Sequence, residues 1–145
     1  MKALIFSDSH HYTAGIHKAM KEHPDTKLII FAGDVQSDAE EIMRTYPRIP
    51  FAYVLGNNDV PYDRFFEFCG QKIFLTHGHN YGVKMSPLRV IMKAKELGAD
   101  ICIFGHTHCQ LLEHNDIWAV NPGTARSGYA VLTVDNGEIN IELKK

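Results

Sequence analysis

Two histidines separated by one threonine, His106 and His108, follow an apolar run and a glycine in the segment ICIFGHTH. The same order, an apolar run and then Asp, Asn, His or Gly, recurs in ALIFSDSH, LIIFAGDV, FAYVLGNND and KIFLTHGH, which begin at Ala3, Leu28, Phe51 and Lys72. Continuous apolar runs of this length are typical of strands buried on both faces. Because sites in open α/β sheets lie beyond the carboxyl ends of the strands, we expect these polar groups to share one rim.

The side chains that follow these runs form an oxygen and nitrogen ligand set without thiolate. They are Asp8, His10, Asp34, Asn57, His77, His106 and His108. Such a set suits the divalent ions of Mn, Fe, Zn or Ni. It exceeds what a tetrahedral catalytic zinc with an open position needs, and it suits two ions with one bridging carboxylate. A pair of ions of this kind typically acts on phosphate esters, and its excess positive charge would attract them.

The stretches between these strands have the periodicity of amphipathic helices. Helices are expected over residues 12–22, 37–46 and 86–98. Ser37 and Glu40 predict a capping box at the start of the second helix. Leu88, Ile91 and Met92 predict the apolar stripe of the third. Because the first two helices each follow a strand, they indicate βαβ units.

The second half of the chain predicts antiparallel strands. Residues 64–76 carry a glycine between two apolar runs, which indicates a hairpin. Residues 129–143 predict a second hairpin that turns at Asn136 and Gly137. Further short strands are expected over 110–114 and 117–120. These strands are too many for one sheet covered by three helices, so we expect two stacked sheets with helices outside, in the α/β class.

Composition narrows the classes of function. The chain has 145 residues, which suits one domain over residues 1–145. Its net charge is -2, with 15 Lys and Arg against 17 Asp and Glu, which argues against an extended nucleic-acid face or a basic membrane patch. The three cysteines lack a C-x-x-C pairing and indicate reduced thiols in the cytoplasm. Apolar runs are too short for a signal peptide or a membrane span.

The order D-x-H, G-D, G-N-x-D, H-G-H and G-H-T-H, from Asp8 to His108, resembles the calcineurin-like metallophosphoesterase superfamily. It resembles more narrowly the small single-domain phosphodiesterase-like branch. The segment from Val120 to Arg126 is similar to the Asn-Pro-Gly-Ser segment of that branch. The resemblance implies a four-layer α/β/β/α sandwich of two mixed β-sheets flanked by helices.

The resemblance also implies which residues hold the metal. One ion would take Asp8, His10, Asp34 and His108. The other would take Asp34, Asn57, His77 and His106, with Asp34 as the bridge. The implied activity is a divalent-metal-dependent phosphodiesterase that hydrolyses small phosphate esters by attack of a metal-bridging hydroxide. Mn is the preferred ion, and Fe, Zn and Ni remain open because all accept this ligand set.

One position departs from the family pattern. Many active members have Gly-Asn-His-Asp, whereas this chain has Asn58 in place of that histidine. An asparagine can hydrogen-bond a phosphate oxygen but cannot act as a general acid. His79 is the nearest replacement by motif and His11 a weaker one, although His79 fits a supporting role equally well. We therefore expect a preference for esters with acidic leaving groups.

Two other functions remain as alternatives. The first is a non-catalytic protein-binding scaffold that resembles the metallophosphoesterase-fold subunit of retromer, a reading that the Asn58 replacement keeps open. The second is a nuclease, which would need a long basic groove. A phosphate contact by Arg126 and a surface position for it are left equally open, and Asp59 is read as a supporting residue or a turn cap. A homodimer is one way to complete the cleft of so short a chain.

Overall fold

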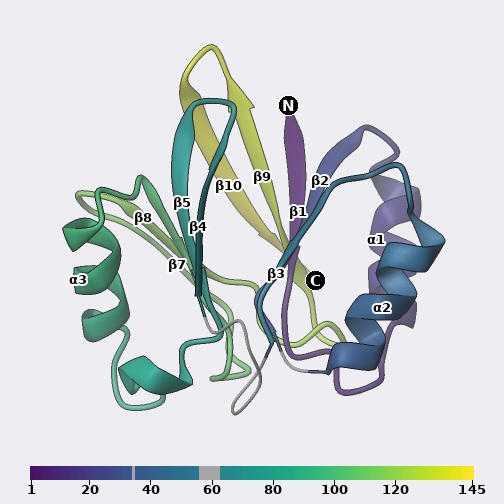
Figure 1. Ribbon diagram of the computed structural model, residues 1–145, viewed down its shortest axis with the longest axis horizontal. Helices are drawn as coiled ribbons and strands as arrows, with labels where there is room; N and C mark the ends of the chain where they lie inside the picture. Colours follow the sequence, from purple (N-terminus) through teal and green to yellow (C-terminus); the bar gives the residue numbers. More distant parts are fainter. Residues whose placement is uncertain (34, 56–62) are drawn as a thin grey trace.

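A computed structural model describes residues 1–33, 35–55 and 63–145. Two β-sheets stack face to face in the described part of the chain (Figure 1). The first sheet has the strand order β10-β9-β1-β2-β3. Its strands are β1 (Lys2–Phe6), β2 (Thr26–Phe31), β3 (Phe51–Tyr53), β9 (Tyr129–Asp135) and β10 (Glu138–Lys144). The pairs β1–β2 and β2–β3 are parallel, whereas β9 pairs antiparallel with both β1 and β10.

The second sheet has the strand order β4-β5-β6-β8-β7. Its strands are β4 (Asp63–Phe68), β5 (Gln71–Thr76), β6 (Ile101–Ile103), β7 (Leu111–His114) and β8 (Trp118–Asn121). β5, β6 and β8 are parallel, and each edge strand is antiparallel to its neighbour. Both sheets are therefore mixed, which confirms the expected fold class.

Helices cover the outer face of each sheet. The helices are α1 (Ala14–Glu22), α2 (Gln36–Thr45) and α3 (Leu88–Glu96), together with the 3₁₀ turn η1 (His79–Tyr81). Figure 1 shows α1 and α2 beside the first sheet and α3 beside the second, so the layers run α/β/β/α. Each interface between layers has its own apolar cluster. Within the described ranges, no helix has the length and apolar character needed to cross a membrane.

Side chains along a strand point alternately to the two faces of the sheet, so one strand contributes to two of these clusters. In β1, Ala3 and Ile5 pack between the sheets, whereas Leu4 and Phe6 pack under the helices. Full burial of such a side chain contributes about 1.5–3 kcal/mol. Because both faces are covered, the strand is a continuous apolar run, as buried parallel strands require. The polar residues therefore begin beyond the end of the strand.

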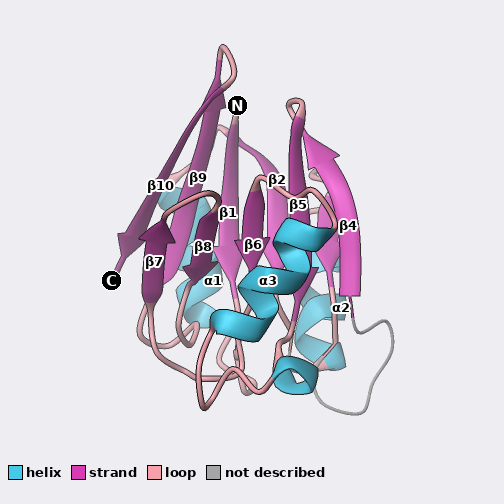
Figure 2. Cartoon of the chain, turned by 90° about the vertical axis from the view of Figure 1, so that its left-hand side faces the viewer, coloured by secondary structure: helices cyan, strands magenta, loops and turns pink. Residues whose placement is uncertain are grey.

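The parallel strands of both sheets end at the same rim. Figure 2 shows the arrowheads of β1, β6 and β8 at one end of the molecule, where the long loops gather. The hairpins β4–β5 and β9–β10 turn at the opposite end, and the second turns at Asn136 and Gly137 as expected. Asn136 and Gly137 both have positive φ, which the two-residue turn requires.

Two local expectations were wrong. α2 begins at Gln36 after Val35 as its N-cap, so Ser37 lies inside the helix and forms no capping box. In α3, the buried residues are Val90 and Ala94. Of the expected stripe, Ile91 packs against the same cluster, whereas Leu88 and Met92 are 60% and 58% exposed. The face that packs on the second sheet is therefore centred on Val90 and Ala94.

Candidate metal centre

A buried carboxylate lies at the centre of the rim. Asp8 directly follows β1 and is 2% exposed. Its Oδ2 accepts hydrogen bonds from the Ser7 hydroxyl and from the His106 backbone N–H at 2.9 Å. Its Oδ1 lies 3.4 Å from Nε2 of His108 and 3.9 Å from Nε2 of His77. One oxygen is therefore held by the protein, and the other faces the imidazoles.

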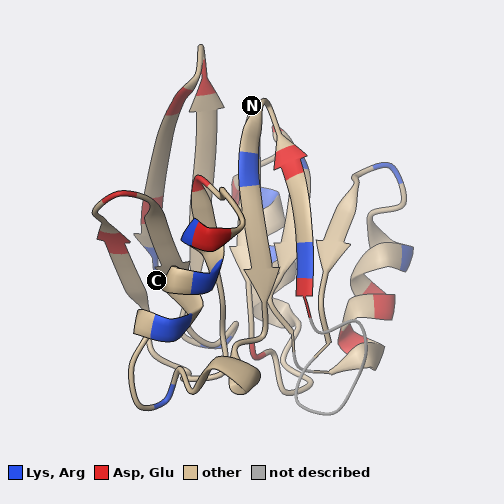
Figure 3. Ribbon diagram, turned by 60° about the vertical axis from the view of Figure 1, so that its left-hand side comes forward, with Lys and Arg blue, Asp and Glu red and all other residues tan. Residues whose placement is uncertain are grey.

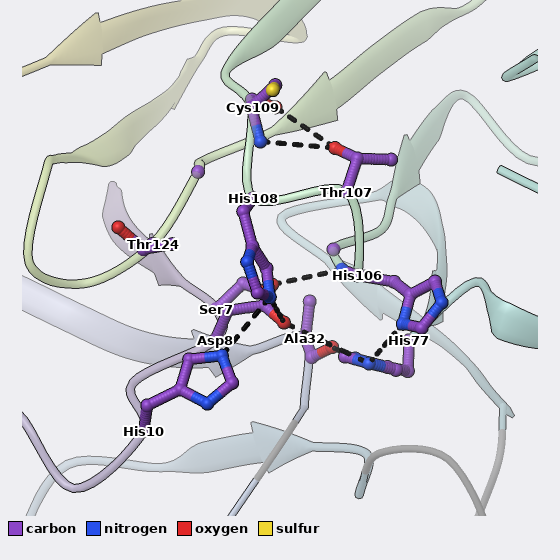
Figure 4. A network of polar contacts seen from close by, with 12 residues as sticks. Ser7, Asp8, His10, Ala32, His77, His106, Thr107, His108, Cys109 and Thr124 are labelled. Atoms are coloured by element: carbon purple, nitrogen blue, oxygen red, sulfur yellow. Dashed lines mark hydrogen bonds and ion pairs between the residues drawn. The ribbon is translucent and has the colours of Figure 1, made fainter. Parts of the chain in front are cut away.

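Four imidazoles surround this carboxylate in two pairs. Nε2 of His10 lies 3.1 Å from Nε2 of His108, and Nδ1 of His106 lies 3.1 Å from Nε2 of His77. Figure 4 shows the first pair on one side of Asp8 and the second pair on the other. The loops after β1, β5 and β6 supply these rings, so the site joins the two sheets.

The ring of His77 has a defined orientation. His77 is 2% exposed, and its Nδ1–H donates a hydrogen bond of 2.8 Å to the carbonyl oxygen of Ala32. This bond assigns the proton to Nδ1 and leaves the lone pair of Nε2 directed at the site. Gly33 makes the contact possible, because its φ is +106° and a Cβ there would lie 2.6 Å from Nδ1 of His77.

The loop from Gly105 to His108 is fixed by the neighbouring strand. Asn121, at the end of β8, is fully buried and donates from Nδ2 to the Gly105 carbonyl at 3.1 Å and to the Thr107 hydroxyl at 2.9 Å. Its Oδ1 accepts the N–H of Gly123 at 2.9 Å. A Cβ at Gly105 would lie 1.9 Å from the Ser7 hydroxyl oxygen, so only glycine lets the two loops meet.

The backbone at the rim is strained. Asp8, His10, His106 and His108 all have positive φ, between +46° and +72°. Residues other than glycine adopt this conformation uncommonly, because Cβ is crowded there. Such residues persist where surrounding contacts hold them, and they concentrate at functional sites. The strain thus accompanies the convergence of the side chains.

The donors fit a divalent cation. Asp8, His10 and His108 each offer one ligand atom, and these atoms lie within 4.8 Å of one another. Donors bound at about 2.1 Å to one ion lie about 3.0–3.4 Å apart, close to several of the separations given above. No lysine or arginine of the described segments forms an ion pair with Asp8, whose buried charge needs a cationic partner.

The pKa shifts of His106 and of the neighbouring His79 are compatible with metal binding at this rim. Burial and the neighbouring His77 and Lys84 lower the pKa of His106. Burial, and then His77, lower the pKa of His79. A lowered pKa keeps an imidazole neutral near pH 7, and only the neutral ring can bind a metal.

The remaining predicted residues are placed as follows. Asp34, Asn57, Asn58 and Asp59 lie outside the described residues. The ring centroid of His79, at the start of η1, lies 5.9 Å from that of His77 and 6.1 Å from that of His106. The structure thus brings His79 to the edge of the imidazole group.

Two further candidates lie away from the ligand cluster. The guanidinium carbon of Arg126 lies 4.1 Å from the centroid of the Tyr12 ring. His11 is exposed, and its Nδ1 lies 3.7 Å from a carboxylate oxygen of Asp38. Both side chains therefore contact protein partners rather than the described ligand atoms.

Sequence reasoning missed Ser7 and the contacts of Asn121. Ser7 is hidden because a serine at a strand end has no distinctive signal. Asn121 does carry a signal, since it follows the apolar run Ile117–Val120 and precedes Pro122 and Gly123. The polar residue at the end of β8 therefore fits the pattern of the other parallel strands.

Comparison with known proteins agrees with the fold. Residues 1–137 match the sequence model of the calcineurin-like phosphoesterase superfamily domain. The chain belongs to this superfamily, whose members use divalent metal ions. It is 35% identical over 150 residues to the probable metallophosphoesterase YsnB of Bacillus subtilis, with 94% of this chain and 86% of that protein covered.

Two more distant relatives extend the comparison. Identity to the phosphodiesterase MJ0936 of Methanocaldococcus jannaschii is 28% over 168 residues, which cover 100% of this chain and 96% of that protein. The crystal structure of a predicted phosphoesterase from Streptococcus pneumoniae superposes with a TM-score of 0.78 at 21% identity. That match covers 97% of this chain and 87% of the other, and it supports the fold alone.

Proposed function

We propose that this protein is a divalent-metal-dependent phosphodiesterase that hydrolyses small phosphate esters at a dinuclear centre. The observation that carries the proposal is the buried Asp8 carboxylate, which faces imidazoles from both sheets and has no lysine or arginine partner among the described residues. The name phosphodiesterase borne by a relative that covers the whole chain supports the reaction class. A buried anion among neutral imidazoles is well suited to bind cations.

In this proposal the ligands divide into two sets. Asp8, His10, Asp34 and His108 hold one ion, and Asp34, Asn57, His77 and His106 hold the other. The separation of the described imidazoles into two pairs on either side of Asp8 supports this division. Mn is the preferred occupant, because a mixed carboxylate, amide and imidazole set accepts it readily.

Bound divalent ions would supply Lewis acidity and lower the pKa of coordinated water. The chain's own residues set up the site around them. The Ala32 carbonyl orients His77, and Ser7 and the His106 N–H orient Asp8. In this proposal Asn58 would donate a hydrogen bond to a phosphate oxygen of the substrate, and His79 would supply the proton to poor leaving groups.

The role of His79 has a defined pH dependence. Because burial and His77 lower its pKa, the acid form of His79 is a minor species at neutral pH. The fraction of His79 that can donate a proton increases as pH falls. Its contribution to the hydrolysis of poor leaving groups therefore increases toward acid pH, whereas esters with acidic leaving groups need no such proton.

The charge distribution favours small substrates over long nucleic acids. Figure 3 shows lysines and arginines interspersed with aspartates and glutamates over the coloured part of the chain. The 15 Lys and Arg are outnumbered by 17 Asp and Glu. A protein that follows a nucleic-acid backbone uses a continuous basic groove. A single phosphate ester needs only the local charge of the metal centre.

The proposal is tested by loading the protein with Mn and assaying aryl phosphodiesters, phosphomonoesters and cyclic nucleotides. We expect turnover of diesters that depends on Mn and is abolished by chelation, with rates that fall steeply as the leaving-group pKa rises. His79→Ala should lower the rate for alkyl leaving groups by about 10²–10⁴-fold and leave aryl diesters little changed. His114→Ala, an exposed histidine stacked on Trp118, is the matched control.

The outcomes separate the enzyme from the alternative. A flat dependence on leaving-group pKa, with chemistry rate-limiting, would contradict the expected preference for acidic leaving groups that follows from Asn58. Bound metal without turnover of any ester would instead favour the non-catalytic scaffold.

A further inference from the structure

The loop that carries His10 has an unusual backbone. The N–H of Tyr12 donates to the Ser9 carbonyl at 2.7 Å and closes a four-residue turn. The two central residues, His10 and His11, have φ of +46° and +68°. Two positive φ values in succession are the mark of a type I′ turn, which natural sequences usually build from asparagine and glycine. Here both positions are histidine, and the turn is intrinsically disfavoured.

A buried carboxylate from another element contacts this turn. Asp38 lies in the first turn of α2 and is 5% exposed. Its Oδ2 accepts hydrogen bonds from the Ser9 hydroxyl and from the His11 backbone N–H at 2.8 Å. Its Oδ1 lies 3.7 Å from Nδ1 of His11. The carboxylate therefore contacts the residues on both sides of His10, at the start of the turn and at its second central position.

The contacts account for the burial of Asp38. A buried carboxylate is costly unless charge-assisted hydrogen bonds compensate it. The Ser9 hydroxyl and the His11 N–H supply them, and both are groups of the turn. Ser9 is itself 1% exposed, so loss of the carboxylate leaves its hydroxyl without this partner in a buried place. Asp38 and the turn thus depend on each other.

We infer that Asp38 is a positioning residue that fixes the strained Ser9–Tyr12 turn and so holds His10 beside Asp8 and His108. The inference rests on the proposed metal function. α2 begins two residues after Asp34, so the same carboxylate joins the loop of His10 to the segment that follows the proposed bridging ligand. Residues that orient metal ligands typically change metal affinity by about 10–100-fold when they are lost.

The test compares Mn binding to the wild type, Asp38→Ala, Asp38→Asn and the control Glu40→Gln, a residue on the exposed part of the same helix. Titrations followed by calorimetry and by the EPR signal of coupled Mn pairs report each site without assaying activity. We expect Asp38→Ala to weaken the ion held by His10 by about 10–100-fold and the ion held by His77 and His106 by less than threefold. Asp38→Asn keeps one acceptor oxygen, so its effect is expected to be intermediate.

Rescue separates positioning from a general structural role. In Asp38→Ala, the added change His11→Gly gives the turn a residue that adopts positive φ without strain. We expect the double variant to regain most of the Mn affinity, although it restores no contact to α2. Failure of the rescue in a folded double variant, or equal weakening of both ions, overturns the inference. If Asp38→Ala alone does not fold, Asp38→Asn with and without His11→Gly decides in the same way.

The result is distinguishable from failure of the proposed function. Wild-type protein that binds no Mn contradicts the proposed metal centre itself. Wild-type protein that binds two Mn ions, with Asp38→Ala unchanged, contradicts only the role of Asp38.

Discussion

The two sheets bring different chemistry to one seam. β1 of the first sheet ends at the buried carboxylate Asp8, whereas β5 and β6 of the second end at the imidazoles of His77 and His106. Among the described residues, the contacts that cross between the sheets here include the hydrogen bonds from the His106 N–H to Asp8 and from the His77 Nδ1–H to the Ala32 carbonyl. The first sheet contributes this carboxylate and the imidazole of His10, whereas the other described imidazoles of the site come from the second sheet. The candidate site is therefore a property of how the sheets meet.

The loops of the two sheets are also held by different means. On the first sheet, the buried Asp38 carboxylate of α2 contacts the turn that carries His10. On the second, the buried Asn121 amide of β8 contacts the loop that carries His106 and His108. In both cases the holding group is buried and belongs to an element beside the loop, which is helix α2 in the first case and strand β8 in the second. Strained loops at this rim thus rely on polar groups from rigid elements.

The largest effect is expected from removal of the charge shared by both ligand sets. Asp34→Asn should weaken the binding of both proposed ions, because an amide lacks the charge and the bridging capacity of a carboxylate. We expect activity to fall on the order of 10³-fold or more, because metal stabilisation contributes several kcal/mol. Metal content and diester hydrolysis measure the change. Unaltered values for both would remove the bridging assignment.

The next largest effect is expected from forcing the sheets apart at the seam. Gly105→Ala places a Cβ 1.9 Å from the Ser7 hydroxyl and 2.7 Å from Oδ2 of Asp8. We expect a loss of about 3 kcal/mol in the free energy of unfolding, together with weaker Mn binding. Gly137→Ala is the matched control, because open space surrounds it and only its positive φ is strained. That control should cost about 1 kcal/mol and leave Mn binding intact.

A smaller effect is expected when only the second sheet loses its holding group. Asn121→Ala leaves the Gly105 carbonyl and the Gly123 N–H without their buried partner. We expect unfolding to become easier by about 2 kcal/mol. Asn121→Ala should also reduce the affinity for the ion held by His77 and His106. The control Asn140→Ala, on β10, should reduce that affinity less. Denaturant unfolding measures the change in stability, and Mn titration measures the change in metal affinity. Equal results for Asn121→Ala and Asn140→Ala would contradict the holding role.

The smallest perturbation probes the outer core of the second sheet. Burial raises the pKa of the Cys102 thiol to about 12, whereas Cys69 and Cys109 are exposed. Because the thiolate is the reactive form, we expect a thiol reagent to label Cys69 and Cys109 in the native protein and Cys102 only after unfolding. Mass spectrometry of labelled peptides identifies the sites. Rapid native labelling of Cys102 would show that this layer opens readily.

Much of the fold could be predicted because buried parallel strands have to be continuous apolar runs. β1, β2, β5 and β6 were found in this way, and their polar ends located the rim. Helix faces were harder to predict. Leu88 and Met92 matched a helical stripe as well as Val90 and Ala94 did, and packing against the second sheet selected the smaller residues.

The supporting contacts of the site could not be predicted. Asp38 reads as an ordinary acidic residue at a helix start, and only the tertiary structure places it against Ser9 and His11. The strain at His10 is likewise hard to predict, since the pair His10-His11 lacks the asparagine and glycine that mark a turn of this type. Ligand types follow from the sequence pattern, whereas the groups that hold them depend on which loops meet.

The most direct test is a crystal grown with excess Mn and examined by anomalous diffraction at the Mn absorption edge. We expect two peaks per chain at the seam of the sheets, one beside Asp8, His10 and His108 and the other beside His77 and His106. Peaks absent from this rim, or located only elsewhere on the molecule, would contradict it.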